Sequence, residues 1–207
     1  MQLTKRRLFG VDRSGPAPEQ TLAGRPLNPW TIPNAIGYFR LAGIPVFLVL
    51  ALSSPDGQDT LAVVLFAVIG WADYLDGFAA RLTGQYSRLG ALLDPVIDRL
   101  LVISGMVVAW EFELLPRWAL GVLAARELFM LLASRFVLKH GLDIEIKMLG
   151  RWAVWPTMFS LFLAMVVDTW VSEVLLYIGI AMTLAATGQY LVDGWRDYRR
   201  RQPSTSA

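Results

Sequence analysis

Four aspartates form two pairs whose spacing suits helices. Asp73 and Asp76 are three residues apart, and Asp94 and Asp98 are four apart, so each pair shares one face of a helix. If the two helices are antiparallel neighbours, all four carboxylates point into one space. Four uncompensated negative charges there would repel one another and would be costly to remove from water. Bound divalent cations would compensate them, and all-oxygen ligation favours Mg²⁺, Mn²⁺ or Ca²⁺ over zinc.

The residues between the two pairs fit a ligand site. Gly77, Ala80 and Gly90 remove side-chain bulk, which allows another helix or a ligand to approach the backbone closely. Arg81 can bind a phosphate or pair with an aspartate, and Ser87 adds a hydroxyl in the connecting loop. Two other interpretations stay open: surface charges at helix ends, and a transport site that binds an ion or relays protons. The apolar flanks favour a functional site, because acids within membrane segments are rare and usually functional.

The elements that carry these residues are long and apolar. Of the 207 residues, 55% are hydrophobic and 17% are charged, whereas soluble domains carry nearer a quarter charged residues. About 20 apolar residues cross a bilayer as a helix, and the apolar runs lack the alternation of barrel strands. The sequence therefore predicts an all-α, polytopic membrane protein with six transmembrane helices. The predicted spans are residues 34–53, 60–81, 89–110, 117–137, 148–167 and 171–192.

The lysines and arginines predict the orientation of these spans. They gather before the first span, between the second and third, between the fourth and fifth, and after the sixth, while the opposite loops have only Arg117 nearby. Because basic loops stay inside the cell, we expect a cell-membrane protein with both termini and the aspartates on the cytoplasmic side. The predicted spans and the polar segments on either side divide the chain into a polar tail (1–28), a membrane domain (29–195) and a basic tail (196–207).

Composition excludes several functional classes. There are no cysteines, so disulfides, thiolate nucleophiles and zinc–cysteine sites are ruled out. The net charge is only +2, and no basic stripe with interleaved aromatics is present, so we expect no nucleic-acid partner.

The aspartates belong to a longer pattern, D-x2-D-G-x2-A-R-x8-G-x3-D-x3-D. Its specified positions are Asp73, Asp76, Gly77, Ala80, Arg81, Gly90, Asp94 and Asp98. This pattern resembles the signature of the CDP-alcohol phosphotransferases (CDP-alcohol phosphatidyltransferases), integral membrane enzymes of phospholipid synthesis. The resemblance extends from about Thr31, in the segment TIPNAIGYFRLAGIPVF, to the sixth span.

The resemblance implies a fold, a reaction and residue roles. Members of the family have six transmembrane helices and a site open to the cytoplasm, and they displace CMP from a CDP-linked lipid with the hydroxyl of an alcohol. By similarity, Asp73, Asp76 and Asp94 hold a two-metal site for Mg²⁺ or Mn²⁺, and Asp98 is both a ligand and the general base. The implied partners are CDP-diacylglycerol, an alcohol acceptor, the lipid bilayer and a second copy of the chain in a homodimer.

The resemblance also assigns the remaining residues of the site. Gly77, Arg81 and Ser87 would contact the CDP group. The segment with Arg126 and Glu127, A-R-E, resembles that of phosphatidylglycerophosphate synthases, so Arg126 would bind the phosphate of the acceptor with Arg151. The expected acceptor is then glycerol 3-phosphate.

The acceptor has a second candidate. Phosphatidylglycerophosphate synthases usually have Gly-Lys-x-Lys where this chain has Gly-Arg-Trp-Ala, residues 150–153, so one of two cations is missing. The alternative is a cardiolipin synthase of the CDP-alcohol type, which takes phosphatidylglycerol. A carboxylate-based ion transporter is the alternative in a different functional class.

Overall fold

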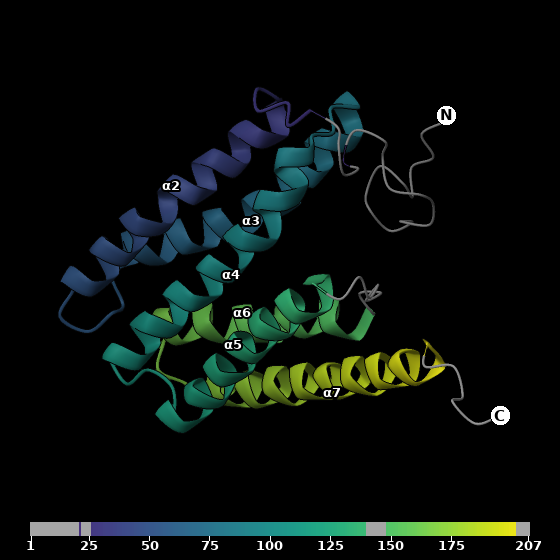
Figure 1. Ribbon diagram of the computed structural model, residues 1–207. Helices are drawn as coiled ribbons and strands as arrows, with labels where there is room; N and C mark the ends of the chain where they lie inside the picture. Colours follow the sequence, from purple (N-terminus) through teal and green to yellow (C-terminus); the bar gives the residue numbers. More distant parts are fainter. Residues whose placement is uncertain (1–20, 22–25, 140–147, 202–207) are drawn as a thin grey trace. The chain divides into compact units, whose positions relative to one another are not determined.

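The structure is a computed structural model that describes residue 21 and residues 26–139 and 148–201; within these ranges the side chains of 134–139, 148–151 and 193–201 are not described. Six α-helices and no strand occur in these ranges (Figure 1). The helices are α2 (Ile32–Ser53), α3 (Thr60–Thr83), α4 (Arg88–Glu111), α5 (Arg117–Lys139), α6 (Met148–Val166) and α7 (Trp170–Arg201).

The all-α prediction is confirmed, and the predicted spans match these helices to within a few residues at nearly every end. The exception is α7, which continues to Arg201 and so includes part of the segment predicted as a basic tail. Hydropathy detects only the apolar part of a helix. It therefore could not reveal that the basic residues after Val192 continue the same helix.

Only part of the six-span prediction is supported. Three segments are long and apolar enough to cross a membrane: α2, α3 and residues 170–192 of α7. The apolar part of α6, residues 152–166, is shorter. The helices α4 and α5 carry charges within their length, among them Asp94 and Asp98 in α4 and Arg126 and Glu127 in α5. These charges lower the hydropathy of both helices.

Side-chain caps set where the first helices begin. The Thr31 hydroxyl accepts a hydrogen bond from the Asn34 amide (3.3 Å) at the start of α2, and the Asp59 carboxylate accepts one from the Ala62 amide (2.9 Å) at the start of α3. Such caps satisfy amides that have no partner within the helix. The helix α3 ends at Gly84, whose φ of 67° is left-handed, a conformation that glycine adopts without steric cost.

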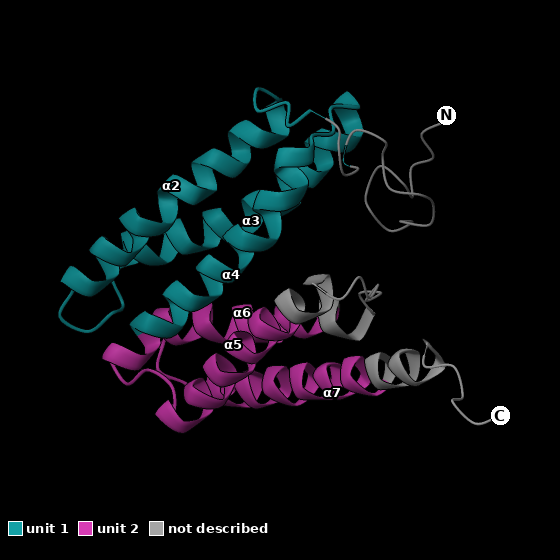
Figure 2. Cartoon of the chain, in the orientation of Figure 1, with its two compact units in different colours: residues 1–108 teal, residues 109–207 magenta. Residues whose placement is uncertain are grey.

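The chain divides into two compact units, residues 1–108 and 109–207 (Figure 2). In the first unit, glycines bring α2 close to its neighbours. A Cβ on Gly43 would lie 2.9 Å from Ile69 of α3, and one on Gly37 would lie 3.8 Å from Ile97 of α4. The rings of Phe47 and Phe66 meet 5.1 Å apart between α2 and α3. Gly43 therefore allows a close approach of α2 to α3, whereas the distance at Gly37 is that of an ordinary van der Waals contact.

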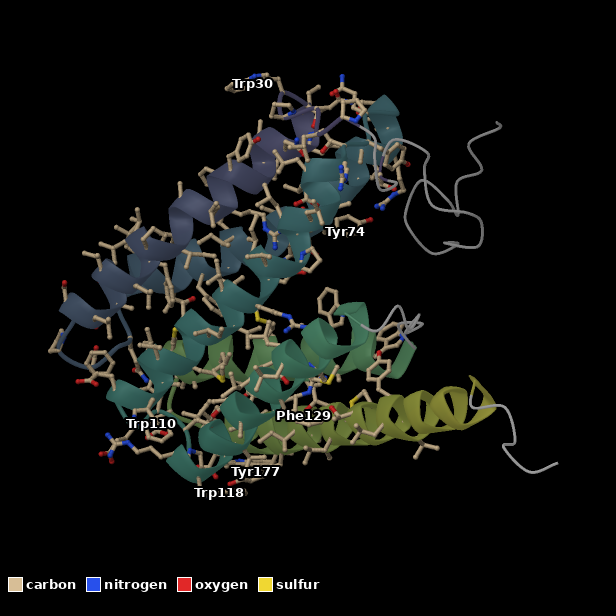
Figure 3. The ribbon with its side chains drawn as sticks, viewed as in Figure 1. Trp30, Tyr74, Trp110, Trp118, Phe129 and Tyr177 are labelled. Atoms are coloured by element: carbon tan, nitrogen blue, oxygen red, sulfur yellow. The ribbon has the colours of Figure 1, made fainter. Side chains whose placement is uncertain are left out.

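In the second unit, α6 and α7 make the closest contact. A Cβ on Gly179 would lie 2.3 Å from the Thr157 hydroxyl oxygen, so only glycine fits there. Trp118 of α5 and Tyr177 of α7 stack with ring centroids 5.5 Å apart (Figure 3). Small residues at such contacts let helices pack without a hydrophobic driving force between them, as membrane helices do.

Candidate active site

The candidate site is organised around Arg40, which is 0% exposed in the middle of α2. Its Nη1 donates hydrogen bonds to Asp73 Oδ1 and Asp76 Oδ2, both at 3.0 Å. Its Nη2 donates to Asp98 Oδ1 at 2.5 Å, and its Nε donates to the Ile69 carbonyl at 3.2 Å. One guanidinium thus joins carboxylates from α3 and α4 to α2.

The structure places the predicted aspartates together in the first unit. The side chain of Asp76 is 7% exposed, whereas those of Asp73 and Asp98 are 49% and 46% exposed. Asp94 interacts electrostatically with Asp73, Asp98 and Arg40. The cluster therefore has a buried side that Arg40 neutralises in part and an open side with two accessible carboxylates.

The donor set fits a hard divalent cation. Carboxylate oxygens are the ligands that Mg²⁺ and Mn²⁺ prefer, and one arginine cannot neutralise four aspartates. In the described part of the chain, no three acidic or histidine side chains are arranged close enough to enclose a metal ion. In the first unit, three of the four carboxylates each form an ion pair with the guanidinium of Arg40.

Gly77 and Arg81 lie together on α3. A Cβ on Gly77 would be 3.3 Å from Nη1 of Arg81, so the guanidinium of Arg81, one turn further along α3, lies over the glycine. The absence of a side chain on Gly77, the residue after Asp76, leaves room for the guanidinium in this position. The predicted contact of both residues with CDP stays a prediction.

Ser87 is buried and hydrogen-bonded at the start of α4, and its predicted contact with the CDP group stays a prediction. Its hydroxyl donates to Asn34 Oδ1 (2.7 Å) and accepts from the Gly90 amide (2.8 Å). A Cβ on Gly90 would lie 2.7 Å from Asn34 Oδ1. The buried Asn34 in turn donates from Nδ2 to the carbonyls of Asn28 (3.0 Å) and Pro29 (3.1 Å). This network joins the start of α2 to the start of the helix that carries Asp94 and Asp98.

The predicted acceptor residues lie in the second unit. Nη1 of Arg126 pairs with Glu127, and its Nε donates to the Thr187 hydroxyl at 3.2 Å. The Arg126 side chain is 13% exposed. Arg151 belongs to α6, but its side chain is outside the described residues.

Arg40 and Asn34 were not among the predicted site residues. A signal for Arg40 was present in the sequence, since it is a single cation in the middle of an apolar span. An ionisable residue in such a segment indicates a buried partner by default. No comparable signal marks Asn34, because an amide near the start of a helix is common as a cap.

Comparisons with known proteins agree with the motif. The family model of the CDP-alcohol phosphatidyltransferases matches residues 30–185. The chain is 37% identical to the CMP-forming cardiolipin synthase of Streptomyces coelicolor, over 77% of each chain. It is 33% identical to a putative cardiolipin synthase of Mycobacterium tuberculosis, over 78% of each. It is 26% identical to the CDP-diacylglycerol–glycerol-3-phosphate 3-phosphatidyltransferase of Bacillus subtilis, over 80% of this chain and 96% of that one.

Both the family match and these relatives extend over most of the chain, through both compact units, and the match includes all four aspartates. The chain belongs to the CDP-alcohol phosphatidyltransferase family.

Proposed function

We propose that this chain transfers a phosphatidyl group from CDP-diacylglycerol to the hydroxyl of phosphatidylglycerol, releasing CMP. The observation that carries the transfer is the carboxylate cluster on Arg40, which contains the aspartates of the family motif. The choice of acceptor rests on the second unit and on the relatives.

The reaction needs charge compensation and a base. The acceptor oxygen forms a bond to the phosphatidyl phosphorus, the bond from that phosphorus to the CMP oxygen breaks, and the hydroxyl loses a proton. Two Mg²⁺ or Mn²⁺ ions, when bound, would neutralise the pyrophosphate and the departing CMP. Asp73, Asp76, Asp94 and Asp98 are the residues that would hold them.

Asp98 is our candidate for the general base. It lies on the open side of the cluster, with a side chain that is 46% exposed, so an acceptor hydroxyl can reach it. A base must come within hydrogen-bond distance of the proton that it removes. Arg81 and Gly77 would bind the CDP group, and Ser87 would contribute through its place at the start of α4. No covalent nucleophile is needed, since phosphoryl transfer depends on positioning and charge.

We further propose that residues 29–195 form a multi-pass domain of the cell membrane, with both termini and the site facing the cytoplasm. Large apolar side chains are exposed along the helices, as a lipid-facing surface requires; examples are Val49, Leu61, Val64, Phe159 and Leu191.

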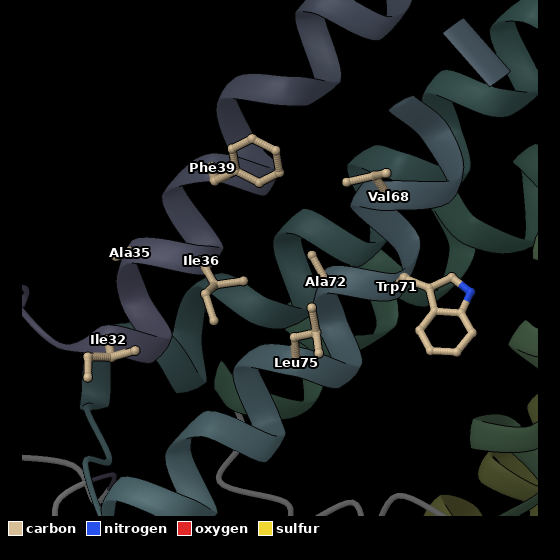
Figure 4. Close-up of a pocket in the computed structure, with 8 residues that line it drawn as sticks. All are labelled: Ile32, Ala35, Ile36, Phe39, Val68, Trp71, Ala72 and Leu75. Carbon is tan, nitrogen blue, oxygen red and sulfur yellow. The ribbon is translucent and has the colours of Figure 1, made fainter. Parts of the chain in front are cut away.

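A pocket of about 550 Å³ between α2 and α3 is lined by apolar side chains, including Phe39 and Leu75 (Figure 4). Assembly as a homodimer stays a prediction from the resemblance.

Two observations favour phosphatidylglycerol as the acceptor. The two relatives quoted at more than 30% identity carry the name cardiolipin synthase, one of them as putative. In addition, Arg126 is already paired with Glu127 and bonded to Thr187. A free phosphate dianion would have to compete with the Glu127 carboxylate for this guanidinium. The reacting end of phosphatidylglycerol is a neutral glycerol, which can bind without displacing Glu127 from the Arg126 guanidinium.

Glycerol 3-phosphate, the acceptor expected from the sequence, remains the second candidate. The Bacillus subtilis relative carries that substrate in its name and is matched over 96% of its length. The Arg126–Glu127 segment also resembles that of enzymes with this acceptor.

The test is a parallel acceptor assay. Purified full-length protein in mixed micelles receives labelled CDP-diacylglycerol, Mn²⁺ or Mg²⁺, and either phosphatidylglycerol, glycerol 3-phosphate or inositol phosphate. We expect CMP release and cardiolipin with phosphatidylglycerol. Formation of phosphatidylglycerophosphate instead would identify glycerol 3-phosphate as the acceptor. No CMP release with any acceptor would favour the ion transporter.

Replacing Arg126 separates the two acceptors further. If phosphatidylglycerol is the acceptor, Arg126→Gln should change its KM little. If glycerol 3-phosphate is used and Arg126 holds its phosphate, the same change should raise the acceptor KM more than the KM for CDP-diacylglycerol. The two KM values, measured in the same preparation, decide between these cases.

A further inference from the structure

Arg40 contacts three of the four aspartates but has no part in the chemistry described above. We propose that Arg40 is a positioning residue, which sets the carboxylates of Asp73, Asp76 and Asp98 in the arrangement that binds divalent metal. The inference rests on the proposed function, because it assumes that these aspartates are the metal ligands.

The guanidinium itself is held in place from several sides. Nε donates a hydrogen bond to the Ile69 carbonyl of α3 (3.2 Å), and the two Nη atoms donate to Asp73, Asp76 and Asp98. Arg40 is 0% exposed. A planar group fixed in this way is a rigid reference for the carboxylates that bind to it.

The contacts of Arg40 take up only part of each carboxylate. Arg40 uses one oxygen of each carboxylate: Oδ1 of Asp73, Oδ2 of Asp76 and Oδ1 of Asp98. The second oxygen of each is not bonded to the guanidinium. Groups that bind the outer oxygen of a ligating carboxylate orient it, and their loss weakens metal binding. Arg40 is therefore placed to orient three carboxylates that bind metal through their other oxygen atoms.

A second possibility is that Arg40 only supplies positive charge to a crowded acidic site. A lysine would supply the same charge, but a single ammonium cannot reproduce a planar fork that bonds three carboxylates and a backbone carbonyl. Arg40→Lys therefore separates orientation from charge. Arg40→Gln removes the charge and most of the bonds together.

The experiment measures Mn²⁺ binding by full-length protein in detergent, from the EPR signal of free Mn²⁺. The variants are Arg40→Lys, Arg40→Gln and Phe47→Leu, with helix content and thermal midpoint recorded for each. Phe47 is the matched control, because it is 0% exposed on the same face of α2, seven residues after Arg40, and packs on Phe66 away from the carboxylates. Wild-type CMP release is measured in parallel.

We expect the Mn²⁺ Kd to rise roughly 10- to 100-fold in Arg40→Lys and Arg40→Gln. Phe47→Leu should lower the thermal midpoint and leave the Kd unchanged, which separates loss of orientation from loss of stability. The deciding variant is Arg40→Lys, since it keeps the buried charge and so folds more readily than Arg40→Gln.

Two results would overturn the inference alone. A wild-type Kd in Arg40→Lys would mean that charge suffices, and tighter Mn²⁺ binding in either variant would mean that Arg40 competes with metal. A wild-type protein that neither binds Mn²⁺ nor releases CMP would instead overturn the proposed function and this inference with it.

Discussion

Arg40 and Arg126 are both shielded arginines paired with acids on helices, but they are paired in different ways. Arg40 bonds three aspartates that are 33, 36 and 58 residues away in the sequence. Arg126 pairs with the next residue, Glu127, and with the Thr187 hydroxyl. The first arginine gathers more negative charge than it can neutralise, whereas the second is neutralised by its neighbour.

This difference leads to an expectation about where charged ligands bind. The cluster around Arg40 has four aspartates, two of them with half-exposed side chains, which favours the binding of cations there. In the second unit, Arg126 is paired with Glu127. We therefore expect the first unit to bind the charged groups of the reaction and the second unit to contribute less to their binding.

The largest effect should follow from the loss of the proposed base. Asp98→Asn should lower kcat by roughly 100-fold or more, because a general base contributes about 10²–10⁴, while CDP-diacylglycerol binding stays largely intact. CMP release and equilibrium binding of the CDP-lipid measure the two parts. The matched control is Asp56→Asn in the exposed loop before α3, which should leave turnover unchanged. Wild-type turnover in Asp98→Asn would refute the base assignment.

The two arginines should also differ in their contribution to stability. Arg40→Met leaves Asp76, with a side chain 7% exposed, without its counter-charge, and breaking a buried ion pair in this way costs about 3–5 kcal/mol. Arg126→Met should cost less, because Glu127 is 16% exposed and can reach water more easily. Thermal midpoints in the same detergent test the order. A larger decrease in the thermal midpoint for Arg126→Met than for Arg40→Met would contradict this order.

The smallest effect comes from two glycines, one in each unit. A Cβ on Gly90 would lie 2.7 Å from Asn34 Oδ1, whereas one on Gly188 would meet nothing within 4 Å. Gly90→Ala should therefore destabilise the protein by about 1–3 kcal/mol through overpacking. Gly188→Ala should stabilise it by about 0.5–1 kcal/mol, because alanine is the better helix former. Unfolding midpoints that move in the same direction for both would contradict this packing.

The sequence was sufficient to predict the helices and the meeting of the aspartates. Apolar runs located all six helices, and the three- and four-residue spacing put each pair of aspartates on one face. Spacing within a helix could not show what lies opposite that face. The contact of Arg40 with Asp98 depends on how α2 and α4 pack, through Gly37 and Ile97, and no local pattern encodes it.

Two hydrogen bonds could not be predicted, because each joins residues that are far apart in the sequence. The hydroxyl of Ser87 was expected to face a ligand, and its bond to Asn34 depends on a residue 53 positions earlier. Arg126 was expected to bind the acceptor phosphate, and the adjacent position of Glu127 could not show that the two side chains pair instead. Only the structure shows that Thr187 of α7 holds the same guanidinium.

The most direct test of the central claim, that the aspartates around Arg40 are the reaction site, is a Mn²⁺ titration of chelator-treated enzyme. Bound Mn²⁺ and CMP release are followed in the same samples, for the wild type and for Asp94→Asn. We predict no CMP release in chelator, recovery in proportion to bound Mn²⁺, and a loss of both in Asp94→Asn. CMP release that persists without metal, or that is unchanged in Asp94→Asn, would contradict the assignment.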